Sequence, residues 1–325
     1  MNKLLRIAAI SLVALSVRGF AAAPPALVPG ATPTPEQAAA QAAERDRQAR
    51  LPDTPGTGPY PAMKEEPGSL PDHVVYRPAK LDSLGTTRLG VYIFGNGACS
   101  DDAASSRLHL LEVASHGYLV IAPGRIRTGP GATAPVPPGA PQGRNASPEL
   151  IKALDWALKQ NADPKSPYHG RIDPQALAVS GYSCGGAMAM KVAADPRWKT
   201  VIMMNSGLLN EQLKVSLADM DASKDLLATV HTPVLYTLGG ESDVAWVNAM
   251  DDFKRLKVPV FIADLKGVGH GGTYWQPNGG KAAQVVVAWL QWQLRGDKKA
   301  GQLFTGKDCG LCRDPAWVVQ RKKIS

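Results

Sequence analysis

Residues 179–190 read VSGYSCGGAMAM, and this stretch decides how the rest of the sequence is interpreted. An apolar run ends here in the pattern Gly-x-Ser-x-Gly and is followed at once by small, helix-favouring residues. The pattern predicts a strand that turns sharply into a helix, with Ser183 at the apex. Gly181 and Gly185 are then needed because a side chain at either position would collide with neighbouring backbone. The alternative is an ordinary glycine-rich connection that contains a serine.

Short apolar runs alternate with helical stretches on both sides of this turn. The runs cover residues 73–79, 89–96, 118–124, 177–183, 201–207, 234–240 and 258–265. The helical candidates cover about 103–116, 147–161, 185–194, 245–256 and 280–295. Near-continuous apolar strands separated by helices predict an α/β fold, with a mostly parallel central sheet and helices on both faces.

The first residues of the chain have the composition of a targeting segment. Lys3 and Arg6 precede an apolar run, and small residues follow it up to Ala22 and Ala23. This order predicts a secretory signal peptide over residues 1–23, cleaved near Ala22 or Ala23. An uncleaved membrane anchor is the alternative, but the run is short for a spanning helix. We therefore expect an exported protein, secreted or periplasmic, with no stable membrane insertion.

The remaining chain divides into an arm and a domain. Residues 24–69 are rich in proline and alanine and contain one polar helix pattern, so we expect a linker or a loosely docked arm. Residues 70–325 are expected to form the domain, ending in a tail that contains cysteines. Two long connections, 124–146 and 208–230, are expected either to shape a substrate entrance or to be surface excursions.

Composition and charge exclude several classes of protein. Of the 325 residues, 44% are hydrophobic and 20% are charged, which is typical of a globular chain. The formal net charge is +8, and about +5 remains after the leader is removed. The basic residues are scattered, which indicates a solvated surface, so we expect no nucleic-acid partner.

Ser183 is a candidate nucleophile because of its position in the predicted turn. A serine hydroxyl needs a histidine to accept its proton and a carboxylate to orient that histidine. Asp243 follows the run 234–240, and His270 lies in a glycine-rich loop after the run 258–265. Loops at the carboxyl ends of parallel strands meet at one edge of a sheet, so the three side chains are expected to converge.

The other histidines and Asp264 are weaker candidates for the base and the acid. The remaining histidines lie at strand starts, on a helix or in a loop before the serine: His73, His109, His116, His169 and His231. Asp264 is the main rival for the acid, but it ends the strand that delivers His270, whereas Asp243 comes from a separate strand.

When a serine attacks a carbonyl carbon, negative charge develops on the carbonyl oxygen, and backbone N–H groups are needed to stabilise it. One donor is expected from Cys184, the residue after the serine, and another from the glycine-rich loop that begins at Asn96 and Gly97. An ordinary strand-to-helix turn would explain the glycines of that loop equally well. It would not explain why Ser, Asp and His follow in order.

Five motifs together resemble a known superfamily: FGNGACS, ASHGYLVIAPG, GYSCGGAMA, GGESDVAW and GVGHGG. Over about residues 70–295 the chain resembles the α/β-hydrolases, and most nearly the secreted branch related to dienelactone hydrolases and bacterial polyester hydrolases. The resemblance implies an α/β-hydrolase fold without a separate cap domain. It also implies Ser183 as nucleophile, Asp243 as acid and His270 as base.

The same resemblance implies that the N–H groups of Asn96 and Cys184 form the oxyanion hole. Two departures limit what it says about substrate. Dienelactone hydrolases have a cysteine where Ser183 stands, and polyester hydrolases usually have an aromatic residue where Asn96 stands. The dienelactone substrate is therefore not carried over, and the resemblance gives weaker support to a polyester substrate.

The four cysteines fit an oxidising compartment. We expect two disulfides, Cys99–Cys184 and Cys309–Cys312, with Cys99 and Cys184 lying beside segments predicted to meet at the site. A zinc site would need two close pairs, and a thioredoxin-like redox site would need a preceding βαβ pattern. Two buried free thiols at Cys99 and Cys184 remain an alternative.

The expected function is hydrolysis of a carboxylic ester, small or polymeric, through an acyl-serine, with no cofactor and no metal. Amide or peptide hydrolysis by the same residues is an alternative, as is a non-catalytic binding protein on the same scaffold. Gly97, Tyr182, Trp246 and Trp275 are candidate substrate-binding residues. For each aromatic residue, packing in the core is the alternative.

Overall fold

The computed structural model describes residues 34–132, 144–210 and 222–325. The predicted leader 1–23 lies outside these ranges, as do the central parts of the two long connections. The described residues form one nine-stranded sheet in the order β1-β2-β4-β3-β5-β6-β7-β8-β9. The strands are β1 (Ala62–Glu65), β2 (His73–Pro78), β3 (Leu89–Gly95), β4 (Tyr118–Pro123), β5 (Ile172–Tyr182), β6 (Thr200–Met204), β7 (Val234–Leu238), β8 (Val260–Leu265) and β9 (Trp317–Lys322).

The sheet is parallel through its centre and antiparallel at its edges. Strands β4, β3, β5, β6, β7 and β8 pair in parallel, whereas β1, β2 and β9 pair antiparallel. The predicted α/β fold with a mostly parallel sheet is confirmed. Two edge strands were not predicted: β1 is short and half-buried, and β9 lies beyond the last predicted helix. Neither carries the long apolar run from which the inner strands were recognised.

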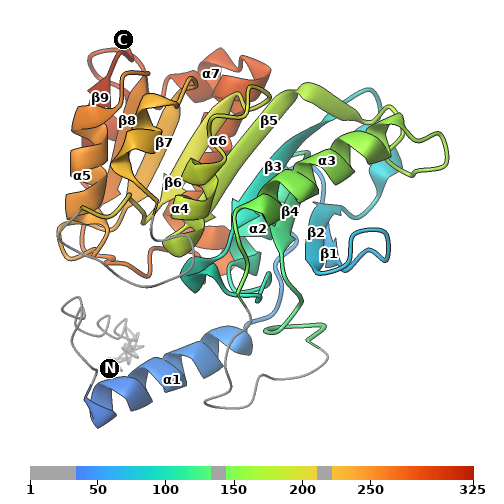
Figure 1. Cartoon of the computed structure of the whole chain (residues 1–325), viewed down its shortest axis with the longest axis horizontal. Helices are drawn as coiled ribbons and strands as arrows, with labels where there is room; N and C mark the ends of the chain where they lie inside the picture. Colours follow the sequence, from blue (N-terminus) through green and yellow to red (C-terminus); the bar gives the residue numbers. More distant parts are fainter. Residues whose placement is uncertain (1–33, 133–143, 211–221) are drawn as a thin grey trace, which may run out of the picture.

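Helices cover both faces of the sheet (Figure 1). The described ranges contain α1 (Pro35–Ala49), α2 (Arg107–Ser115), α3 (Pro148–Ala162), α4 (Cys184–Lys191), α5 (Trp246–Arg255), α6 (Gly280–Arg295), α7 (Lys298–Gly301) and α8 (Gly310–Arg313). Of these, α1 lies apart from the sheet (Figure 1). Helices α3, α4 and α5 share one apolar core with one face of the sheet, and α2 and α6 share a second core with the other. Within the described ranges, no helix combines the length and the apolar character that crossing a membrane requires.

The inner strands serve both cores because successive side chains point to opposite faces. On β3, Val91 and Ile93 pack with the α3 side, whereas Tyr92 and Phe94 pack with the α2 side. All four side chains are fully buried. A strand covered on both faces is apolar at every position, and this explains the unbroken runs in the sequence.

The segment before β2 is held more firmly than expected for a loose arm. The backbone N–H of Thr57 donates to Glu112 Oε2 at 2.7 Å, and that of Gly58 donates to Ser115 Oγ at 2.9 Å. Strand β1 then pairs with β2. The structure therefore starts the sheet inside the segment 24–69, because α2 and β2 supply partners for its backbone.

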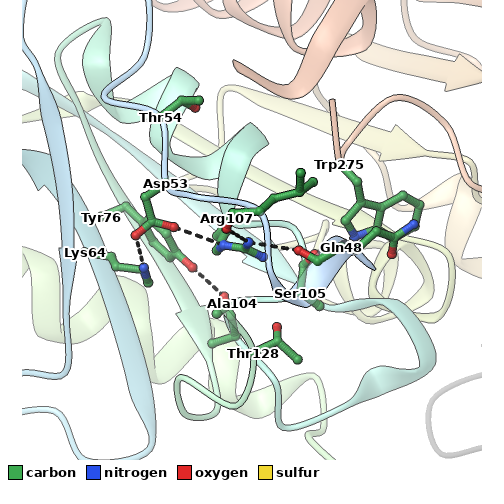
Figure 2. Close-up of polar contacts among 12 residues, drawn as sticks. Gln48, Asp53, Thr54, Lys64, Tyr76, Ala104, Ser105, Arg107, Thr128 and Trp275 are labelled. Atoms are coloured by element: carbon green, nitrogen blue, oxygen red, sulfur yellow. Dashed lines mark hydrogen bonds and ion pairs between the residues drawn. The ribbon is translucent and has the colours of Figure 1, made fainter. Parts of the chain in front are cut away.

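A buried arginine anchors the same segment (Figure 2). The Arg107 side chain is only 2% exposed and donates through Nε to Asp53 Oδ1 at 3.0 Å. Its Nη2 donates to the carbonyl oxygens of Gln48, at 3.0 Å, and Leu51, at 2.6 Å. Lys64, also buried, pairs with the same aspartate. Since a buried cation without partners is costly, Asp53 and the carbonyl groups of Gln48 and Leu51 supply the partners that Arg107 requires.

The second core contains a buried histidine, His109 on α2. Its Nε2 lies 3.2 Å from Tyr92 Oη, and its ring packs against Phe94 and edge-on against Tyr274. Burial lowers the pKa of His109 from 6.5 to about 3, against a smaller opposing effect of Glu112. The ring is therefore neutral in the folded protein at neutral pH.

His109 should make stability depend on pH. As the pH falls below about 6.5, the unfolded chain takes up a proton at this position and the folded chain does not. The associated stability is complete above pH 6.5 and is lost toward pH 3, by up to about 1.4 kcal/mol per pH unit. The wild type should lose unfolding free energy as the pH falls from about 6.5 to 5. In His109→Gln this loss, measured by urea denaturation at the two pH values, should be smaller by about 2 kcal/mol. An unchanged loss would contradict this account of His109.

Candidate active site

Ser183 occupies a strained turn between β5 and α4. Its backbone has φ 53° and ψ −121°, outside the conformations that non-glycine residues prefer. Its N–H donates to the Met204 carbonyl at 3.0 Å. Its own carbonyl accepts from Gly186 N at 2.9 Å and from Ser206 Oγ at 2.7 Å. These three hydrogen bonds hold the turn that the sequence predicted.

The glycines around Ser183 are required by backbone contact. A Cβ at Gly181 would lie 2.0 Å from the carbonyl oxygen of Gly185. A Cβ at Gly185 would lie 2.0 Å from the carbonyl oxygen of Gly95, at the end of β3. No side chain fits at such distances, so the start of α4 packs directly on the neighbouring strand end. An ordinary glycine-rich connection would not impose this requirement.

Ser183, His270 and Asp243 form one hydrogen-bonded chain. Ser183 Oγ lies 2.9 Å from His270 Nε2, and His270 Nδ1 lies 2.7 Å from Asp243 Oδ1. A carboxylate only accepts hydrogen bonds, so Nδ1 carries the proton and Nε2 accepts from the serine hydroxyl. The Asp243 side chain is fully buried, whereas the histidine side chain is 30% exposed. Of the three hydrogen-bonded residues, the aspartate is therefore shielded from solvent, and the site opens to solvent on the serine side.

The Asp243 carboxylate is surrounded by donors. Besides His270, Oδ1 accepts from Ala245 N at 2.9 Å, and Oδ2 accepts from Asn205 Nδ2 at 2.7 Å and from Gly239 N at 3.3 Å. Burial is the largest influence and raises the pKa of Asp243, but the hydrogen bonds from His270, Ala245 and Asn205 together hold it below its usual value. The carboxylate is therefore ionised at neutral pH despite its burial.

Asp264, the rival for the acid position, has a different set of partners. Its Oδ1 accepts from Gly240 N at 2.5 Å and its Oδ2 accepts from Trp246 Nε1 at 2.8 Å. Burial and the nearby negative charges of Asp243 and Glu241 raise its pKa. Asp264 therefore shapes the loop that carries Asp243, and the histidine is bound to Asp243.

The loop after β3 lies directly beside the Ser183 turn. The Asn96 side chain is buried, and its Nδ2 donates to the carbonyl oxygens of Ser100, at 2.9 Å, and Pro123, at 2.6 Å. A Cβ at Gly97 would lie 2.4 Å from the ring of Tyr182. The side chain of Asn96 thus fixes the loop and leaves its backbone next to the turn.

A disulfide joins the two segments. Cys99 and Cys184 are bonded, with their Cα atoms 5.2 Å apart, and both are buried. The second pair, Cys309–Cys312, is also bonded. Both predicted disulfides are confirmed, and the described residues contain no free cysteine. The first bond ties the loop after β3 to the first residue of α4.

The predicted aromatic residues do not all gather at one place. Tyr182 donates through Oη to the His270 carbonyl at 2.9 Å, and its ring lies 5.4 Å from the imidazole. Trp275 packs edge-on against Tyr182 at 6.1 Å and donates to the Ser105 carbonyl. The Trp246 indole points to Asp264 and lines a groove of about 510 Å³ along α5. Tyr182 therefore packs on the histidine, Trp275 packs on Tyr182, and Trp246 lies behind the loop that carries Asp243.

The sequence did not single out Asn205, which contacts both Asp243 and the histidine loop. A signal was present, because Asn205 is the first polar residue after the apolar run of β6. Polar residues at the carboxyl ends of parallel strands tend to meet at one edge. The same rule led to Asp243 and His270.

Comparisons with family models and with curated proteins gave no match. In the part of the chain that the structure describes, no three His, Cys, Asp or Glu side chains are grouped so as to hold a metal ion.

The two disulfides should stabilise the fold unequally. They span sequence separations of 85 and 3 residues, and a longer closed loop constrains the unfolded chain more. Chain entropy gives about 4.5 kcal/mol for the first and about 2 kcal/mol for the second. Paired alanine substitution of Cys99 and Cys184 should therefore lower the free energy of unfolding in guanidinium more than the matched change of Cys309 and Cys312. Equal losses would contradict this ranking.

Proposed function

We propose that the protein is a serine hydrolase that cleaves carboxylic esters through an acyl-serine intermediate. The observation that carries this proposal is the chain of hydrogen bonds from Ser183 through His270 to the buried carboxylate of Asp243. Such a chain converts a weakly nucleophilic hydroxyl into a nucleophile. The resemblance of the motifs to α/β-hydrolases supports the same reaction.

In the first half-reaction, Ser183 Oγ attacks the ester carbonyl carbon while its proton moves to His270 Nε2. The Nδ1 proton stays in the hydrogen bond to Asp243, whose negative charge stabilises the imidazolium. The tetrahedral intermediate then collapses. The bond to the leaving oxygen breaks, and Nε2 returns its proton to that oxygen, releasing the alcohol.

The oxyanion of the intermediate would be held by the backbone N–H groups of Asn96 and Cys184. Cys184 begins α4, so the positive end of the helix dipole faces the developing charge. The Cys99–Cys184 disulfide and the side-chain bonds of Asn96 hold the two segments at a fixed separation. Preorganised donors of this kind need no rearrangement during the reaction.

In the second half-reaction, water attacks the acyl carbon of the acyl-serine and His270 Nε2 accepts a proton from that water. Collapse of the second intermediate releases the carboxylic acid and restores the Ser183 hydroxyl. The proposed substrate is a small-molecule or polymeric ester that reaches the exposed end of the site. Two disulfides suit an oxidising compartment, and we propose that the protein acts after export.

Ser183→Ala should leave a folded protein and reduce ester hydrolysis by roughly three or more orders of magnitude. His270→Ala should cost about as much, and the double variant little more, because the residues act as one unit. Turnover of a p-nitrophenyl ester by the purified variants measures this. Turnover of the matching p-nitroanilide by the wild type tests amide hydrolysis. A Ser183→Ala protein as active as the wild type would exclude the assignment.

The two carboxylates provide a second test. Asp243→Asn should reduce kcat by roughly 10³- to 10⁴-fold, because an amide does not hold the imidazole in the required tautomer. Asp264→Asn should cost less than roughly tenfold, because Asp264 accepts hydrogen bonds from Gly240 and Trp246 and makes none with the histidine. If Asp264→Asn were the more damaging change, Asp264 would be the acid.

A further inference from the structure

One buried side chain connects the parts of the proposed site that come from different strands. Asn205 follows β6 directly and is 1% exposed. Its Nδ2 donates to Asp243 Oδ2 at 2.7 Å and to the Gly269 carbonyl at 3.1 Å. Gly269 is the residue before His270. The same amide therefore contacts the acid and the backbone that carries the base.

The orientation of the Asn205 amide is determined by its neighbours. The Asp243 carboxylate and the Gly269 carbonyl can only accept, so the NH₂ group must face them. The oxygen then faces Tyr274, whose hydroxyl donates to Asn205 Oδ1. Burial, with smaller contributions from Tyr182 and Asp243, raises the pKa of Tyr274 well above 10 and keeps this donor protonated. Every polar atom of the amide thus has a partner.

The backbone at Asn205 suits this residue type. Its φ is 42°, in the left-handed region that asparagine, aspartate and glycine tolerate best. Its N–H donates to the Thr237 carbonyl on β7 at 2.7 Å. The position is therefore rigid, and it fixes the amide where β6 and β7 lie side by side.

We propose that Asn205 is a positioning residue that sets the orientation of Asp243 and of the loop carrying His270. The proposal rests on the proposed hydrolase function. The amide holds one carboxylate oxygen and leaves the other directed at His270 Nδ1. By holding the Gly269 carbonyl, it also keeps the imidazole aligned with Ser183.

Asn205→Gly removes the amide and tolerates the left-handed backbone. It should lower kcat for a p-nitrophenyl ester by roughly 10- to 100-fold with little change in KM, because hydrogen bonds to a charged partner are lost. The matched control is Asn278→Gly. Asn278 also has a left-handed backbone, with φ 56°, but lies in the loop before α6. A kcat for Asn205→Gly within threefold of that control would overturn the proposal.

Asn205→Asp keeps the shape of the side chain and adds a titratable group. At low pH the introduced carboxyl group and Asp243 share one proton, which can form a hydrogen bond to Asp243 as the amide hydrogen does. At higher pH both groups are ionised and repel each other. The ratio of variant to wild-type kcat/KM should therefore rise as the pH falls. A purely structural role would give a ratio that does not vary with pH, and that result would also overturn the proposal.

A readout independent of turnover separates this proposal from the proposed function. The proton between His270 Nδ1 and Asp243 should give a far-downfield ¹H NMR signal in the wild type, absent in His270→Ala. Asn205→Gly should shift or broaden this signal, whereas Asn278→Gly should not. An inactive wild type with this pattern would refute the hydrolase function alone. An active wild type whose signal is unaffected by Asn205→Gly would refute the positioning role alone.

Should the Asn205 variants fail to fold, Tyr274→Phe supplies the test. It deletes the donor to Asn205 Oδ1 and should lower kcat by roughly 3- to 10-fold. Tyr92→Phe is its control, because Tyr92 is equally buried and its hydroxyl bonds to Ser180. Equal kcat values for the two variants would overturn the proposal.

Discussion

Direct backbone contact between the start of α4 and the end of β3 is the constraint on which the site depends. The contact admits no Cβ at Gly185, and the packing of the same helix start against the end of β5 admits none at Gly181. The chain therefore turns sharply within the single residue Ser183. The strained φ of that residue persists because hydrogen bonds with Met204 at the end of β6, with Ser206 just beyond it and with Gly186 in α4 hold the turn. Ser183 therefore lies at the edge of the sheet that is formed by the carboxyl ends of the parallel strands.

Buried charge at this edge is balanced locally. Asp243 is ionised in a buried position only because four donors face it, two of them backbone N–H groups. Removing a donor would therefore affect the carboxylate as well as the geometry of the loop. Asn205 combines both effects, since it contacts the acid and the histidine loop. The proposed reaction requires a fixed negative charge beside His270, and this is the charge of Asp243.

Buried charges are also paired locally in the N-terminal segment, away from the candidate site. Arg107 on α2 and Lys64 on β1 are buried cations, and the single carboxylate of Asp53 forms an ion pair with each. The loop between β3 and α2 ends at Arg107, and Ser105 in that loop accepts from Trp275. The arm is therefore part of the packing around the loop that begins at Asn96. Its composition alone, rich in proline and alanine, gave no indication of these ion pairs.

The sequence by itself predicted the order of the candidate site residues along the chain: a tight turn at Ser183, then a carboxylate for which Asp243 was preferred to Asp264, then His270. Each follows an apolar run long enough to be a buried parallel strand. The sequence also predicted the α/β class from the unbroken apolar runs, and it made the Cys99–Cys184 pairing an expectation that left two free thiols open until the structure showed the bond. Only the tertiary structure decided which carboxylate meets the histidine, that Asn205 bridges the two loops, and that the arm joins the sheet. These depend on contacts between residues far apart in the chain, and no local periodicity records such contacts.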